Sequence, residues 1–310
     1  MPKLYSEIKK NDISSHFPDD LIKYLKEIYK INKRRNNLIF KQISHISEIF
    51  NKKNIRHVLL KGSAFLVIEP YDSRVERMIG DIDILVSKKD LLRSFDTLLR
   101  NGYSIPEKQH ENLTKDIDGF GFRHLSRIIN NDYIAAVELH SELLLNEHSY
   151  KINPEKVLIE RKNFNKKFHV PSDYFLWKHS IMNSQINDHQ YMYNNLCFKT
   201  VLDVISIEPD NVHKTLRNEN EEIIHFYSLL SVFYDAHKLP KSLRKTIYIY
   251  KLNFALFGKL FFLIVSFSNF VKILYSRVIL IFTSNKYRKR IMKNPNQVLM
   301  LFYQKLFPRK

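Results

Sequence analysis

The chain has 310 residues, of which 44% are hydrophobic and 26% charged, so it can bury a core and is neither disordered nor fibrous. Six glycines and ten prolines exclude collagen-like and low-complexity architectures. The single cysteine, Cys197, excludes an internal disulfide and favours a reducing compartment. The first residues lack an apolar segment of signal-peptide length, so we expect a cytoplasmic protein.

The net charge of +18 is distributed unevenly along the chain. Residues 236–310 contain sixteen Lys or Arg and no acidic residue, which leaves 34 basic and 32 acidic residues in the first 235. The basic excess therefore belongs to the C-terminal tail. Aromatic residues of the tail gather in apolar runs instead of alternating with basic residues, so we do not expect a nucleic acid as partner.

Apolar residues three or four apart predict two amphipathic helices between Asp19 and Asn54. We assign residues 1–56 to N-terminal helices that pack on the core. The core itself is expected at 57–150, with a strand at 55–60, a helix that starts at Lys61, a strand at 81–88 and a helix at 89–100 that ends near Asn101-Gly102. Two further strands are expected on either side of the turn at 130–132. This order predicts an α/β (α+β) fold with a small mixed β-sheet.

The second half of the chain is predicted to be helical. Residues 150–170 are polar and basic and are interpreted as a linker, and helical periodicity resumes in a domain that spans 151–240. The tail, 241–310, has apolar runs at 260–271 and 273–283, both too short to span a bilayer. Two interpretations stay open: the tail packs on the body, or it makes peripheral contact with the anionic inner face of a membrane.

Asp81 and Asp83 stand at the head of an apolar strand, two residues apart and therefore on one face. Buried carboxylates require a cation, and a divalent metal is the simplest candidate. The alternative is that both acids are exposed or paired with Arg74 or Arg77. Asp116-Ile117-Asp118 repeats the tripeptide without an apolar run after it, and it is interpreted as a loop.

Two more features accompany the aspartates. Lys61-Gly62-Ser63 forms a turn at a helix start, where backbone N–H groups and a hydroxyl can receive a phosphate. Glu138 interrupts another apolar run, and His140 follows on the same face. Three acids on two strands beside such a turn form the layout that phosphoryl or nucleotidyl transfer requires. His140 either tunes Glu138, contacts the substrate or is structural.

Four motifs recur in the order of a known family: LLKGSAFL at 59–66, GDIDILV at 80–86 preceded by Tyr71 and Arg77, RHLSRI at 123–128 and VELHSELL at 137–144. Over about residues 20–235 the chain resembles the bacterial family of largely uncharacterised nucleotidyltransferases in the DNA polymerase β-like superfamily. The segment of seventeen residues between Ser63 and Asp81, 64–80, is longer than in the commoner superfamily members and is typical of this family.

The resemblance implies a metal-dependent nucleotidyltransferase that moves an NMP from an NTP, such as ATP, to a hydroxyl-type acceptor. Asp81, Asp83 and Glu138 are the implied catalytic residues and ligands of Mg²⁺ or Mn²⁺. Lys61, Gly62, Ser63 and Arg77 are expected to bind the nucleotide. The acceptor stays open. Two alternatives are a glycosyltransferase with an Asp-x-Asp metal motif, and a membrane-surface or scaffold protein that binds nucleotide without turnover.

Overall fold

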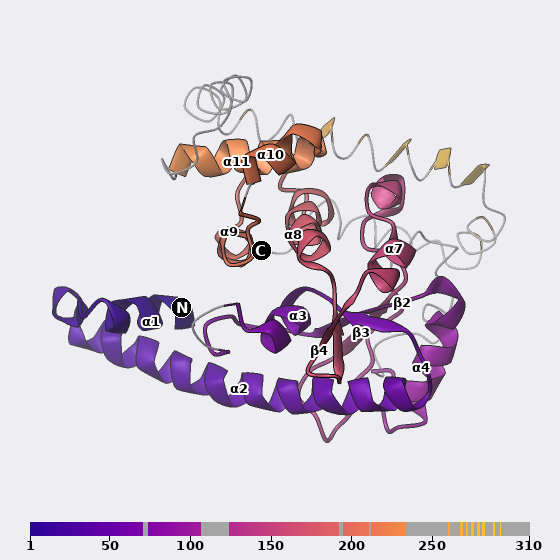
Figure 1. Ribbon diagram of the computed structural model, residues 1–310, viewed down its shortest axis with the longest axis horizontal. Coiled ribbons are helices and arrows are strands. Elements are labelled where there is room, and N and C mark those ends of the chain that lie inside the picture. The colour runs from indigo at the N-terminus through magenta and orange to yellow at the C-terminus, as the bar shows by residue number, and fades with distance from the viewer. Residues whose placement is uncertain are drawn as a thin grey trace.

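The computed structural model describes residues 1–233 except 71–73, 107–123, 192–194 and 211, and beyond 233 only scattered positions between 260 and 292 (Figure 1). The α-helices are α1 (Pro2–Lys10), α2 (Asp19–Lys52), α3 (Lys61–Ile68), α4 (Leu91–Leu99), α7 (Pro154–Ile159), α8 (Asp173–Met182), α9 (Phe198–Ile205), α10 (Val212–Thr215) and α11 (Glu221–Phe233). The strands are β1 (His57–Leu59), β2 (Ile82–Val86), β3 (Val137–His140), β4 (Lys162–Phe164) and β5 (Phe168–Val170). Short 3-10 and π turns connect them: Ser14–His16, Lys88–Asp90, Asn146–Lys151, Asn183–Asn187 and Leu216–Asn218.

The central sheet is small and mixed, as the sequence predicts. Its strand order is β1-β2-β3, in which β1 pairs antiparallel with β2 and β2 pairs parallel with β3. The predicted hairpin before β3 is present as isolated antiparallel bridges, between Ile128 and Val137 and between His124 and His140. The fold is therefore the expected mixed α/β arrangement, with more helix than strand.

The N-terminal region is dominated by one long helix, so the prediction of two helices is wrong. The buried stripe of α2 does not stop between its two apolar stretches, because Asn32 and Asn36 are buried at its centre and continue the spacing that Leu25 begins and Ile39 resumes. Figure 1 shows α2 extending beneath the sheet, with α1 lying along its N-terminal part.

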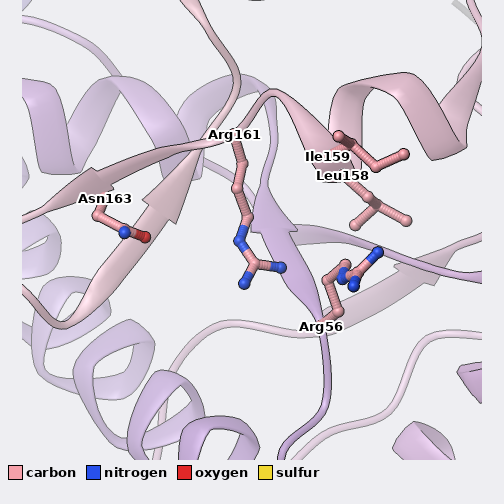
Figure 2. A pocket seen from close by; sticks show the side chains of 5 residues that line it. All are labelled: Arg56, Leu158, Ile159, Arg161 and Asn163. Carbon is pink, nitrogen blue, oxygen red and sulfur yellow. The ribbon is translucent and has the colours of Figure 1, made fainter.

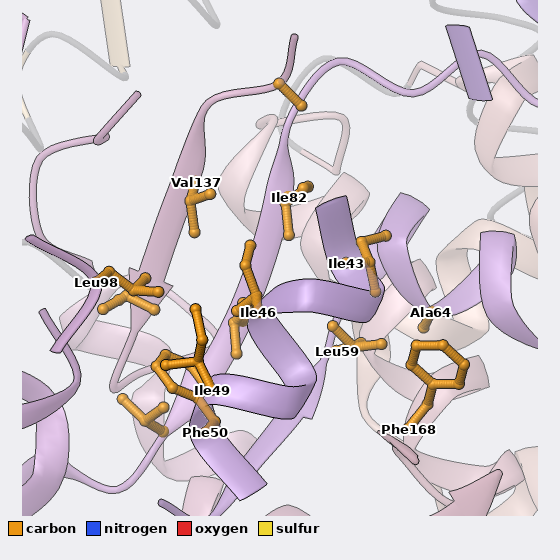
Figure 3. Close-up of a cluster of buried hydrophobic side chains, with 14 of the residues drawn as sticks. Ile43, Ile46, Ile49, Phe50, Leu59, Ala64, Ile82, Leu98, Val137 and Phe168 are labelled. Carbon is orange, nitrogen blue, oxygen red and sulfur yellow. The ribbon is translucent and has the colours of Figure 1, made fainter. Parts of the chain in front are cut away.

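The sheet separates two apolar clusters because successive residues on a strand point to opposite faces. On one face, Leu59, Ile82 and Val137 pack with Ile43, Ile46 and Phe50 of α2, as Figure 3 shows. On the other face, Val58, Leu60 and Leu85 join a cluster built from α7, α8, α9 and α11. Asp83, Glu138 and His140 alternate with the first set and so belong to this second face.

The prediction that residues 150–170 form a linker is wrong. It contains α7 and the antiparallel pair β4-β5, and Phe168 and Val170 lie in the same cluster as α2. Its polar composition reflects the exposed β4, while only alternate residues of β5 are buried. The domain boundaries at 56, 150 and 240 stay predictions.

Candidate active site

The sheet register brings two of the predicted carboxylates face to face. In the parallel pair β2-β3, Asp83 lies opposite Glu138, and His140 lies opposite Leu85. Asp83 and Glu138 are 2% and 8% exposed, so both carboxylates are withdrawn from bulk water. Buried carboxylates are stable only beside positive or donor groups, and the surrounding residues supply these.

Asp83 has two strong partners. The Lys61 Nζ lies 2.6 Å from Asp83 Oδ1, and the His140 Nε2 lies 2.8 Å from the same oxygen. Burial alone would raise the pKa of Asp83, but the hydrogen bond with His140 and the charge of Lys61 outweigh burial and hold that pKa well below its usual range. Burial lowers the pKa of His140 to about 4, against the opposing effect of Asp83. The site therefore contains an ionised Asp83 and a neutral His140 at pH 7.

The other two acids have weaker compensation. Glu138 Oε1 accepts a hydrogen bond from Arg127 Nη2 at 3.1 Å, and its Oε2 lies 3.8 Å from His140 Nε2. Asp81 is partly buried, and burial followed by repulsion from Asp83 and Glu138 raises its pKa, although Lys61 and Arg127 oppose the shift. Asp81 is thus the acid of this group whose negative charge the neighbouring cations offset least.

Asp83, Glu138 and His140 form a group that fits a metal ion. One ligand atom from each lies within 4.8 Å of the other two. Carboxylate oxygens suit Mg²⁺ and Mn²⁺, and a neutral imidazole nitrogen adds a ligand that Mn²⁺ and Zn²⁺ also accept. Among the described residues, Asp81 is outside this group, so its role as a metal ligand stays a prediction. His140, which the sequence did not assign as a metal ligand, belongs to the group.

The turn after β1 places Lys61 over the acids. Lys61 has a positive φ of 46°, which costs a non-glycine residue about 1 kcal/mol, and its ammonium reaches Asp83 from this conformation. The Asp83 N–H donates to the Ser63 Oγ at 3.2 Å, and the Leu60 N–H donates to the Asp83 carbonyl at 2.9 Å. The predicted phosphate-binding turn is thereby fixed to the strand that carries Asp83.

Gly62 and Arg77 are close neighbours. A Cβ at Gly62 would lie 2.5 Å from Arg77 Nη1, so a larger residue would displace this guanidinium. Arg77 donates from Nε and Nη2 to the two carboxylate oxygens of Asp203 at 2.7 and 2.8 Å, and both side chains are largely buried. Arg77 therefore connects the 64–80 segment to α9. The sequence predicted that Arg77 binds the nucleotide, and it did not predict this ion pair.

Three polar residues of α2 hold the segment that leads to Asp81. Asn32 and Asn36 donate from their amides to the carbonyls of Arg74, Val75 and Arg77, and Arg35 donates to those of Ile79 and Gly80. Sequence reasoning missed these residues. Their signal was available, since two asparagines four apart occupy an otherwise apolar helical stripe.

A family model described as an uncharacterised nucleotidyltransferase matches residues 1–206, about two thirds of the chain. The protein belongs to this nucleotidyltransferase family. The match extends from α1 to the end of α9, so it includes Asp83, Glu138 and Asp203 and excludes the basic tail. No curated protein matches the chain. Membership of the family supports a transferase with a nucleotide substrate.

Two sequence predictions fall outside the part of the chain that the structure describes. Asp116-Ile117-Asp118 lies within 107–123, and most of the tail at 241–310 is likewise not described. Among the described residues, no helix has the length and hydrophobicity needed to cross a membrane.

Proposed function

We propose that this protein is a metal-dependent nucleotidyltransferase that moves an NMP from an NTP to a hydroxyl-type acceptor. The observation that carries the proposal is the opposition of Asp83 and Glu138 on adjacent strands, with His140 and Lys61 both on Asp83. A bound Mg²⁺ or Mn²⁺ would supply positive charge that offsets the negative charge developing on the phosphate groups. Asp83, Glu138 and His140 would hold this ion. Its positive charge would also offset the repulsion that raises the pKa of Asp81.

The chain's own residues then position the donor and manage charge. In the transfer, the acceptor hydroxyl oxygen forms a bond to the α-phosphorus, the bond from that phosphorus to the leaving pyrophosphate breaks, and the hydroxyl proton passes to a carboxylate or to water. Lys61 is balanced by Asp83 in the structure. With a cation held by the acids, the Lys61 ammonium would be able to contact the triphosphate, beside the N–H groups that open α3.

Calorimetric titration with non-hydrolysable ATP, GTP, CTP and UTP analogues, in Mg²⁺ and in EDTA, tests the proposal. We expect metal-dependent binding of at least one triphosphate, lost in Asp81→Asn/Asp83→Asn and retained in Asp116→Asn, which changes the same tripeptide elsewhere. Parallel titrations with UDP-sugars address the glycosyltransferase alternative, which would be favoured by binding of a nucleotide-sugar alone. Equal loss in the Asp116→Asn control would contradict the assignment.

We also propose that the basic tail contacts anionic membrane surfaces. The support is its charge, sixteen basic residues without an acid, together with apolar side chains at the described positions: Phe267 and Phe282 are 68% and 75% exposed. The test is co-sedimentation of the full chain with vesicles that contain or lack anionic lipid. Binding only to anionic vesicles, weakened when Lys286, Arg288, Lys289 and Arg290 are changed to Gln, is expected; equal sedimentation with both vesicles would exclude this contact.

A further inference from the structure

A second group of charged residues lies at the other end of β1 from Lys61. Arg56, directly before the strand, and Arg161, between α7 and β4, line a cavity of about 300 Å³. Figure 2 shows the two guanidinium groups directed into a common space that Leu158, Ile159 and Asn163 complete. Arg56 and Lys61 are five positions apart, about 16 Å along an extended chain, so the cavity is separate from the candidate active site.

The two arginines of this cavity have no acidic partner among the described residues. The Nη1 of Arg161 is buried and has no hydrogen-bond partner. The adjacent acid, Glu160, faces Lys156 instead, with 3.6 Å between the charged atoms. Burial and then repulsion from Arg56 lower the pKa of Arg161, and no carboxylate offsets either effect.

Two histidines lie near Arg161. The rings of His57 and His169 are in edge contact, with centroids 5.0 Å apart. Burial is the main cause that lowers the pKa of each, and the charge of Arg161 adds to it in both cases. Buried polar groups normally have partners, so the Arg161 Nη1, buried without one beside uncompensated positive charge, indicates a missing acceptor.

An oxyanion supplies what this arrangement lacks. Guanidinium groups bind phosphate through parallel N–H···O bonds, and two of them in one cavity offset two negative charges. A cavity of this volume is at the lower limit for small-molecule sites. We propose that the cavity binds a phosphate group, either free inorganic phosphate or the phosphate of a small phosphorylated molecule. The site stands apart from the donor site, and its occupancy does not depend on Lys61.

The first experiment is calorimetric titration of the full-length protein with inorganic phosphate in EDTA, at constant ionic strength. We expect binding that weakens about tenfold or more in Arg56→Gln and in Arg161→Gln, since each removes one guanidinium from the phosphate. Arg34→Gln, which removes an exposed cation from α2, and Lys61→Gln, which alters the candidate active site, should leave it within about twofold. A parallel titration with glycerol 3-phosphate separates the sources: tighter binding identifies a phosphorylated molecule, and equal binding identifies inorganic phosphate.

Thermal unfolding with and without phosphate keeps the test valid if a variant folds poorly. Phosphate should raise the melting temperature of the wild type and of Arg34→Gln, and should raise that of Arg161→Lys less, because lysine keeps the charge but not the bidentate geometry. Arg56→Gln and Arg161→Gln that unfold cooperatively and bind phosphate like the wild type would overturn the proposal. Loss of phosphate binding in Lys61→Gln alone would also overturn it, by locating the anion at the candidate active site.

Discussion

The two ends of β1 treat charge in opposite ways. At the Lys61 end, cations and acids neutralise one another: Lys61 and His140 both contact Asp83, and Arg127 contacts Glu138. At the Arg56 end, Arg56 and Arg161 face each other without an acid among the described residues. At the first end, Asp83 and Glu138 have cationic or donor partners, and Asp81 is the acid that is least compensated. At the second end, the described residues supply no compensating acid, and an oxyanion from solution would supply the missing negative charge.

The largest expected difference between the two ends is in catalysis. Asp83→Asn should reduce nucleotidyl transfer by about 100-fold or more, because it removes a ligand of the metal group and the partner of Lys61. Arg161→Gln should change the rate by less than about threefold, since the cavity is remote from the reacting atoms. Steady-state rates at saturating NTP and metal would check this. A rate loss in Arg161→Gln that matches Asp83→Asn would mean that the two ends act as one site.

The next difference is in stability. Asp203→Asn should reduce the free energy of unfolding by about 3 kcal/mol, because it breaks the buried, bidentate pair with Arg77 that connects the 64–80 segment to α9. Urea unfolding monitored by circular dichroism would measure this. The matched control is Asp173→Asn, which breaks the exposed contact with Lys162 and should cost less than about 1 kcal/mol. Equal costs would show that the Arg77 contact does not organise the segment.

A smaller effect concerns acid stability at the Arg56 end. Burial, reinforced by His169 and Arg161, lowers the folded-state pKa of His57 from 6.5 to about 4. Between these values the unfolded chain binds a proton that the folded protein does not, so stability falls as pH falls below 6.5, by about 2 kcal/mol at pH 5. His57→Phe should remove this contribution and make the acid limb shallower in unfolding curves measured from pH 7 to pH 5, whereas the exposed His16→Phe should not. Parallel limbs in His57→Phe and wild type would contradict the prediction.

The smallest expected effect is a gain in thermal stability. Arg161→Gln should raise the melting temperature in phosphate-free buffer by about 1–3 °C, because it removes a guanidinium whose Nη1 is buried without a partner. Differential scanning calorimetry would detect this shift. A decrease of similar size would indicate that Arg161 has a stabilising partner, and it would remove the contrast between the two ends of β1.

The sequence predicted the parts of the site that depend on local periodicity. Alternation along strands placed Asp81 with Asp83 on one face and Glu138 with His140 on one face, and the sheet register brings Asp83 opposite Glu138. It did not predict the pair of Arg77 with Asp203, because these residues are 126 positions apart and no periodic rule relates them. The basic cavity was missed for the same reason, since it forms only when the α7-β4 connection reaches the start of β1.

The long helix α2 was mispredicted through a rule applied too narrowly. Interpreting the polar stretch around Asn32 and Asn36 as a break assumes that a buried stripe contains only apolar residues. Here the two amide NH2 groups are buried and donate to backbone carbonyls, so the stripe is continuous although its hydrophobicity is not. A buried asparagine pair with helical spacing predicts such a contact and could have been used to infer one helix.

The hydrogen bonds from α2 to the 74–80 segment affect which substitutions this segment tolerates. Asn32, Arg35 and Asn36 bind only carbonyl oxygens of that segment, and every residue type presents the same carbonyl. The path of the chain into Asp81 is therefore held by the helix as well as by the segment's own buried side chains, which include Val75, Ile79 and the Arg77 that pairs with Asp203. Exposed positions such as Met78 should therefore tolerate substitution, whereas a change at Asn36 removes its hydrogen bonds to the carbonyls of Arg74 and Arg77 together.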